Sequence, residues 1–299
     1  MKSQIPNPKP QKNSKFQIQN LKIEKLLPGV KRDILLKKYT TFKIGGPAKF
    51  FFIAKKKEDL IKAVLVAKKY RLPLFILGGG SNILISDKGF KGLVIKIQNT
   101  KYKIQSTKLY GEAGAKMSTL VRETTKKGLA GLEWAAGLPG TLGGAIRGNA
   151  GAFGGETKDN ILWVEALDQK GNLRKFSKKQ SKFSYRSSIF KKKNLIILEA
   201  LLKLKRGNSK KLQKIVRDHI KYRKDRGPLE YPNAGSIFKN YPIRKAPKKM
   251  REKFLPVVKK DPFLVIPTAY IISEAGLKGL KVGRAQISEK HPNFIINLG

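Results

Sequence analysis

Two glycine-rich clusters are the residues of this sequence best suited to chemistry. Residues 137–156, GLPGTLGGAIRGNAGAFGGE, hold eight glycines in twenty positions. The second cluster, at residues 78–82, reads GGGSN and directly follows the apolar run at 74–77. Small residues leave main-chain N–H groups uncovered, and a turn of uncovered N–H groups after a strand binds phosphate. Two such turns in one chain predict a large nucleotide cofactor that is held at more than one point.

The alternative is that the glycines only turn the chain, which is the commoner role of a single glycine-rich loop. Neither cluster matches the GxGxxG dinucleotide fingerprint or the GxxxxGK[ST] phosphate loop. The sequence therefore disfavours a Rossmann or P-loop fold. If a cofactor binds here, we expect a different fold to hold it.

Composition narrows the class of protein. The chain has 299 residues, of which 40% are hydrophobic, and this is enough for a real core. It has no apolar run long enough for a transmembrane helix, and its basic N-terminus lacks the apolar stretch of a signal peptide. It has no cysteine, and its two histidines are too few for a histidine-rich metal centre. We expect a cytoplasmic protein without membrane insertion and without a metal.

The net charge is +45, from 65 Lys and Arg against 20 Asp and Glu. Such a charge raises the possibility of nucleic-acid binding. However, 52 of the basic residues are lysine, and they are spread over most of the chain. Recognition of bases and phosphates favours the arginine fork and a gathered patch. We therefore disfavour a nucleic-acid partner and expect the charge to attract anionic small molecules.

Apolar periodicity predicts the elements that position the glycine clusters. We expect a disordered basic arm over residues 1–20 and helices over 21–38, 58–70 and 210–226. Strands are expected over 72–77 and 93–97, with a hairpin over 161–176 that turns at 168–172. Residues 137–156 are expected to form one long glycine loop.

Six motifs, in order, resemble those of the UDP-N-acetylenolpyruvoylglucosamine reductase family. They are TTFKIGGPAKF at 40–50, LGGGSNILISDKGFKGLVI at 77–95, GLPGTLGGAIRGNAGAFGGE at 137–156, SYRSS at 184–188, YPNAGSIFKN at 231–240 and AYIISEAGLKGLKVGRAQISEKHPNFIINLG at 269–299. The resemblance extends from about residue 21 to the last residue. The short loop after SYRSS resembles the type II subgroup of the family.

The resemblance implies an α+β fold in two domains. The first is an FAD-binding domain of the vanillyl-alcohol-oxidase (PCMH) type, expected over residues 21–206 with its core at about 41–206. The second is a smaller α+β substrate-binding domain, expected over 207–299 and shorter than the family's.

The resemblance also implies which residues line the cofactor, a non-covalent FAD that is reduced by NADPH. These residues are Gly78, Gly79, Gly80, Ser81, Asn82, Gly137, Pro139, Gly140, Thr141, Gly143, Gly144, Asn149, Ala150 and Gly151.

The implied reaction reduces the enol ether of UDP-N-acetylglucosamine enolpyruvate to UDP-N-acetylmuramate, a peptidoglycan precursor, in a monomeric enzyme. It needs a hydride at one carbon and a proton at its neighbour. The family pattern places Arg186 on the substrate carboxylate and makes Ser236 the proton donor. The same pattern implies that four residues bind substrate, namely Tyr185, Arg223, Arg226 and Asn240.

Two departures from the family pattern are present. The family continues Asn-Pro where this chain has Asn240-Tyr241-Pro242. The family also carries a third catalytic group, a Glu in an LEPEVR-like strand, beyond the Asn-Leu-Gly at which this sequence stops. Neither Glu274 nor Glu289 stands in that motif position. The alternative expectation is thus a flavin-binding homologue whose catalysis is impaired.

Overall fold

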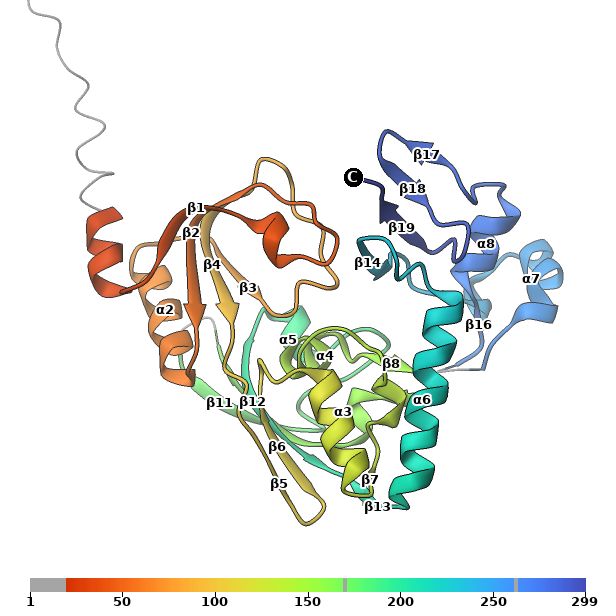
Figure 1. Ribbon diagram of the computed structural model, residues 1–299, viewed down its shortest axis with the longest axis horizontal. Helices are drawn as coiled ribbons and strands as arrows, with labels where there is room; N and C mark the ends of the chain where they lie inside the picture. The colour runs from red at the N-terminus through yellow and green to blue at the C-terminus, as the bar shows by residue number, and fades with distance from the viewer. Residues whose placement is uncertain (1–19, 169–170, 261–262) are drawn as a thin grey trace, which may run out of the picture.

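The computed structural model describes residues 20–168, 171–260 and 263–299, which form three groups of elements (Figure 1). Apart from residue 20, the predicted basic arm lies outside the described residues. The first group surrounds the sheet of β1–β4, the second surrounds a sheet of β5, β6 and β10–β12, and the third contains the C-terminal strands. Within the described ranges, no helix has the length and apolar character needed to cross a membrane.

The first sheet has the strand order β1-β2-β4-β3. Its strands are β1 (Lys31–Leu35), β2 (Pro47–Ala54), β3 (Leu74–Leu77) and β4 (Phe90–Ile97), and α2 (Lys57–Lys69) packs against it. Strands β2, β3 and β4 are parallel, and β1 is antiparallel to β2. Alternate side chains of β2 enter two different hydrophobic clusters, Phe50 on one face and Phe51 on the other. Because the parallel strands end at one edge, the GGGSN turn leaves the sheet beside the end of β4.

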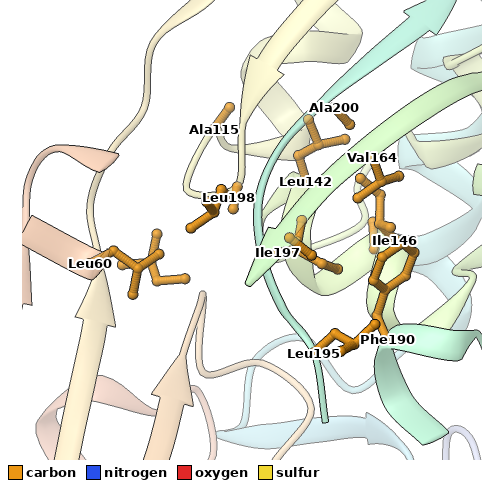
Figure 2. Packing of buried hydrophobic residues seen from close by; sticks show 14 of the residues in the cluster. Leu60, Ala115, Leu142, Ile146, Val164, Phe190, Leu195, Ile197, Leu198 and Ala200 are labelled. Atoms are coloured by element: carbon orange, nitrogen blue, oxygen red, sulfur yellow. The ribbon is translucent and has the colours of Figure 1, made fainter. Parts of the chain in front are cut away.

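The second sheet is antiparallel, in the order β11-β10-β12-β6-β5. Its strands are β5 (Tyr102–Gln105), β6 (Lys108–Glu112), β10 (Ile161–Leu167), β11 (Leu173–Ser177) and β12 (Ile196–Lys203). The helices of this group are α3 (Met117–Lys126), α4 (Leu142–Gly148) and α5 (Ile189–Lys192). Figure 2 shows Leu142 and Ile146 of α4 in the same cluster of buried side chains as Ile197 of β12, so α4 is held against this sheet.

The C-terminal sheet has the order β14-β19-β18-β17. Its strands are β14 (Asn233–Ser236), β17 (Lys281–Val282), β18 (Ala285–Ile287) and β19 (Phe294–Asn297), and the neighbouring helices are α7 (Lys248–Phe254) and α8 (Thr268–Glu274). A small core of Ala246, Phe254 and Ile266 supports this region. The long helix α6 (Ser209–Arg226) packs against α3 and the short helix η2 (Glu133–Ala135). The predicted boundary at 206/207 stays a prediction.

The remaining elements are short. Paired strands are β7 (Leu129–Ala130) with β13 (Lys205–Arg206), β8 (Gly151–Ala152) with β9 (Gly155–Glu156), and β15 (Tyr241–Pro242) with β16 (Val265–Ile266). Further 3₁₀ turns are η1 (Leu36–Tyr39), η3 (Thr157–Asp159), η4 (Ile243–Lys245) and η5 (Leu255–Val257).

Most predicted elements are confirmed, including α2, α6, β3, β4 and the β10–β11 hairpin. The helix predicted over 21–38 is wrong beyond residue 26. Pro28 and Gly29 stop it, because proline cannot continue the helical hydrogen bonds and Gly29 takes a φ of +86°. The chain then forms β1 and η1. The prediction of one long loop over 137–156 is also wrong, because α4 lies inside it.

An ionic cluster ties the first sheet to the second. Lys57, at the start of α2, hydrogen-bonds the carboxylate of Glu165 on β10 and lies 3.3 Å from Glu199 Oε1 on β12. The hydroxyl of Tyr110 on β6 donates to the second oxygen of Glu199. Burial lowers the pKa of Lys57, but its bonds to the two glutamates outweigh that effect and raise it. Burial and the Glu199 bond also raise the pKa of Tyr110. The cluster therefore holds α2 at a fixed place over the second sheet.

We expect Lys57→Met to lower the free energy of unfolding by about 1–3 kcal/mol, because two partly buried carboxylates lose their cation. Urea unfolding of the apoprotein at pH 7 measures this, with Lys62→Met on the exposed face of α2 as the control. Since the folded-state pKa of Lys57 is raised, its contribution is complete below about pH 10 and declines as the pH rises through that pKa. Equal stability of both variants at pH 7 would show that the cluster does not stabilise the fold.

Candidate functional site

The two glycine-rich clusters touch each other. A Cβ added to Gly79 would lie 2.6 Å from Gly140 Cα, and one added to Gly78 would lie 2.9 Å from Thr141 Oγ1. The Ser81 hydroxyl donates to the Pro139 carbonyl at 3.2 Å. Residues that are some sixty positions apart in the sequence thus form one continuous wall, which we call the glycine wall (78–81 and 139–141).

The first half of the wall is anchored by the loop after η1. Gly80 has a φ of +67°, and a Cβ there would lie 2.0 Å from the Tyr39 carbonyl oxygen, so only glycine fits. The Thr41 N–H donates to the Gly80 carbonyl at 3.0 Å. The Thr41 hydroxyl donates to the Asn233 carbonyl of β14 at 2.7 Å. Thr41 therefore connects the wall to the C-terminal sheet, a role that sequence reasoning missed.

The second half of the wall leads into α4, whose first N–H groups are already used. Leu142 N–H donates to the Ala115 carbonyl at 2.8 Å, and Gly143 N–H donates to the Ala113 carbonyl at 2.9 Å. The Gly144 N–H donates to the Thr141 hydroxyl at 3.4 Å. The helix terminus is thus occupied by the protein itself. In the described part of the chain, by contrast, the N–H groups of Gly79 and Ser81 donate to no protein acceptor.

Asn149 ends α4 and is fully buried, with a φ of +42°. Its side-chain amide donates to the Ser184 carbonyl at 3.1 Å and to Glu156 Oε2 at 3.2 Å, and its oxygen accepts from Lys158 N–H at 3.1 Å. All of its side-chain hydrogen-bonding groups therefore have protein partners. Its place in the site is to hold the turn that starts at Ser184.

That turn presents Tyr185 and Arg186 at its tip. Two hydrogen bonds of 3.0 Å between Ser184 and Ser187 close the turn, and Arg186 has a φ of +52°. An arginine in the left-handed region is strained, and such strain is often found at functional sites. The guanidinium donates to the Gly151 carbonyl at 2.7 Å and lies 5.2 Å from the Tyr185 ring centre. Arg186 thus lies at the end of the glycine-rich segment.

The C-terminal region meets this turn directly. The Asn240 N–H donates to the Tyr185 hydroxyl at 3.2 Å, and the Tyr185 ring packs edge-on against Phe263 at 5.2 Å. The Asn240 side-chain oxygen accepts from Thr268 N–H at 3.2 Å, which leaves its NH₂ group for other partners. The two predicted substrate residues Tyr185 and Asn240 are therefore brought together.

Ser236 ends β14 and is exposed, and among the described residues its hydroxyl has no hydrogen-bond partner. The pairing of β14 with β19 shifts register between Asn233 and Ser236. Such a bulge re-aims a side chain. The structure shows no direct bond between Ser236 and Arg186 within the described residues.

Arg223 and Arg226 lie at the end of α6, near Gly137. The Arg223 Nε donates to the Ala136 carbonyl at 2.8 Å, and its guanidinium lies 5.0 Å from the Phe153 ring centre. Burial lowers the pKa of Arg223. Phe153 also stacks on His219 at 3.8 Å, so the β8–β9 turn is fastened to α6. Arg226 is exposed over Tyr222.

Two further predicted cofactor residues, Ala150 and Asn82, differ in how far the protein already occupies them. The N–H and carbonyl groups of Ala150 are both used by protein, with Ala145 and Thr157. Asn82 is exposed at the end of the first turn.

Comparison with known proteins gives matches to both parts of the chain. Residues 48–177 match a family model described as FAD binding domain, and residues 227–299 match one described as the UDP-N-acetylenolpyruvoylglucosamine reductase C-terminal domain. The UDP-N-acetylenolpyruvoylglucosamine reductase of Caldanaerobacter subterraneus subsp. tengcongensis is 40% identical over 265 residues, covering 88% of this chain and 80% of the relative. That of Clostridioides difficile is 37% identical over 276 residues, covering 90% and 82%.

The chain belongs to the UDP-N-acetylenolpyruvoylglucosamine reductase family. A solved structure also supports this, the enzyme of that name from Thermus caldophilus, with a TM-score of 0.72 and 32% identity over 90% of this chain and 88% of that one. The predicted α+β fold, with a PCMH-type FAD-binding domain before a C-terminal domain, is confirmed.

The glycine wall fits the FAD that this family uses. It carries no side chains at Gly79 and Gly140, and within the described residues the N–H groups of Gly79 and Ser81 donate to no protein acceptor. A diphosphate needs such a close approach to the backbone. Within the described residues, the wall is the place where both predicted clusters converge, so we propose it as the cofactor site.

We expect Gly79→Ala to weaken FAD binding by at least tenfold and to destabilise the apoprotein by about 1–3 kcal/mol, because the new methyl would push the two turns apart. Flavin fluorescence titration and urea unfolding measure the two effects. Gly148→Ala in α4 is the control, since a Cβ there meets nothing within 4 Å and alanine favours the helix. Unchanged FAD affinity in Gly79→Ala would contradict the assignment.

Proposed function

We propose that this protein reduces UDP-N-acetylglucosamine enolpyruvate to UDP-N-acetylmuramate, with FAD as cofactor and NADPH as reductant. The observation that carries the proposal is the contact between Tyr185 of the first domain and Asn240 of the C-terminal region, with Arg186 beside it. This contact supports the proposal because it joins the SYRSS and NAGSIFKN motifs through Tyr185 and Asn240, while Arg186 bonds Gly151 of the glycine-rich segment.

The reaction adds one hydride and one proton across a carbon–carbon double bond. FAD, when bound, passes two electrons from NADPH to the substrate as a hydride. The protein must hold the substrate carboxylate, stabilise the negative charge that develops on it and deliver the proton to the neighbouring carbon.

Arg186 is suited to the carboxylate. Its planar fork has five N–H donors, and the Gly151 carbonyl takes a bond from only one of its nitrogens. The turn fixes the backbone, and the Gly151 bond fixes the guanidinium. An arginine held in this way stabilises an enediolate without first having to reorganise.

Ser236 is suited to donate the proton. Its hydroxyl is exposed and has no partner among the described residues, so its hydrogen is available to a substrate. Asn233 Oδ1 accepts from Gly235 N–H at 2.9 Å and so shapes the backbone just before Ser236. A serine is a weak acid, so nearby cations must favour its alkoxide.

The UDP portion of the substrate is proposed to meet Arg223, Arg226 and the free NH₂ of Asn240. Arg223 already holds the loop at Ala136 with Nε, and its buried Nη2 has no protein partner among the described residues, so a phosphate that reached it would satisfy this donor. We also propose that the protein acts as a monomer in the cytoplasm, in peptidoglycan precursor synthesis for cell-wall growth, cell shape and cell division.

We expect Ser236→Ala to leave the rate at which NADPH bleaches the flavin absorbance nearly unchanged. The substrate-dependent return of that absorbance should slow by about 10²–10⁴-fold, because the proton is needed only in this second half of the cycle. Stopped-flow absorbance at the flavin band measures both rates. Ser273→Ala, an exposed serine of α8, is the control.

If Ser236→Ala returned the absorbance at the parent rate, Ser236 would not be the donor. A parent protein that binds FAD and is bleached by NADPH, but shows no return with substrate, would favour the impaired homologue instead.

We expect Arg186→Lys to lower kcat by about 10²–10³-fold with a smaller change in KM, because lysine keeps the charge but loses the planar fork. Steady-state kinetics with the purified holoenzyme measure this. Arg174→Lys on β11, at the far edge of the second sheet, should behave as the parent. A kcat within threefold of the parent for Arg186→Lys would remove Arg186 from the reaction.

A further inference from the structure

The glycine wall has donors but little charge. The first N–H groups of α4 donate to the carbonyls of Ala115 and Ala113 and to the Thr141 hydroxyl. The N-terminus of the helix therefore offers none of these donors to a ligand. In the described part of the wall, the N–H groups of Gly79 and Ser81 have no protein acceptor, and these main-chain groups carry no charge. A diphosphate carries negative charge, and charge-assisted hydrogen bonds are roughly twice as strong as neutral ones. A cation beside the wall is therefore expected.

Lys96 is in the right place to be that cation. It stands on β4 opposite Leu77, the last residue of β3, and the two strands lie side by side (Figure 1). Its Nζ donates to the carbonyl of Gly78, the first residue of the wall. One of the three ammonium donors is thus used to hold the turn, and two remain.

Lys96 is also a half-buried cation without an anion. None of the ion pairs within the described residues includes Lys96. Burial, together with the neighbouring charge of Lys116, lowers its pKa. Lys116 follows Ala115 and pairs with Thr141 in an isolated bridge, so it lies at the opposite half of the wall. Two neighbouring ammonium groups that share no carboxylate cost free energy, and a bound anion removes that cost.

We propose that Lys96 is the charged anchor of the cofactor's diphosphate, with Lys116 as a second, more exposed cation on the other half of the wall. This inference rests on the proposed function insofar as the wall takes FAD. It assigns to Lys96 a direct contact with a phosphate oxygen while its third donor holds the Gly78 carbonyl. The same side chain would then couple cofactor binding to the shape of the turn.

The test is FAD binding to apoprotein, measured by quenching of flavin fluorescence at several NaCl concentrations. We expect Lys96→Met to raise the Kd by about 10- to 100-fold and to flatten its dependence on salt, because a charge–charge contact is lost. Lys96→Arg keeps the charge and should stay within about threefold of the parent. Lys91→Met, an exposed lysine on the same strand, is the matched control. Lys116→Met should raise the Kd less than Lys96→Met.

The outcomes separate the proposal from the proposed function. A Lys96→Met variant with the parent Kd and salt dependence would overturn the role of Lys96. Equal weakening in Lys96→Met and Lys96→Arg would also overturn it, because shape rather than charge would then matter. A parent apoprotein that binds no FAD at all would instead refute the proposed function. ADP competition against FAD adds a readout for the diphosphate half, and it should weaken in Lys96→Met in parallel with FAD.

Discussion

The direct contact of two glycine turns is the constraint on which this site depends. Gly79 and Gly140 approach so closely that a single methyl group on Gly79 would overlap the other backbone. One turn leaves the first sheet and the other enters α4, so their contact fixes how the two sheets sit relative to each other. Glycine is required at position 79 because any side chain there would overlap the backbone of Gly140.

Short chains of hydrogen bonds connect this contact to Ser236 and Arg186, the two residues proposed to react. Thr41 joins Gly80 to Asn233, three residues before Ser236. On the other side, α4 ends at Asn149, whose buried amide holds the turn that carries Arg186. The two residues proposed to react, Ser236 and Arg186, are therefore held by hydrogen bonds to neighbouring elements. A site built in this way holds its geometry without paying for reorganisation during each turnover.

The sequence predicted where the glycine turns lie, because glycines directly after an apolar run mark a turn at the end of a strand. It did not reveal α4, since glycines at 143, 144 and 148 weaken helix propensity and the helix is stabilised by burial of Leu142 and Ile146. Nor could it reveal the contact of Tyr185 with Asn240, which joins residues 55 positions apart. The roles expected of Tyr185 and Asn240 came from the family resemblance. The local sequence pattern predicted neither the contact between them nor α4.

The large positive net charge of the chain can be related to individual ion pairs in the structure. Carboxylates are scarce, and several of them are engaged in internal pairs, such as Glu165 with Lys57 and Glu156 with Lys158. The two cations proposed to bind the ligands, Lys96 and Arg186, take part in none of the ion pairs of the described residues. A carboxylate beside them would compete with the phosphates and the carboxylate of the ligands. The overall excess of lysine raises the local concentration of anionic ligands, but only cations that are held in place and left unpaired contribute to binding them.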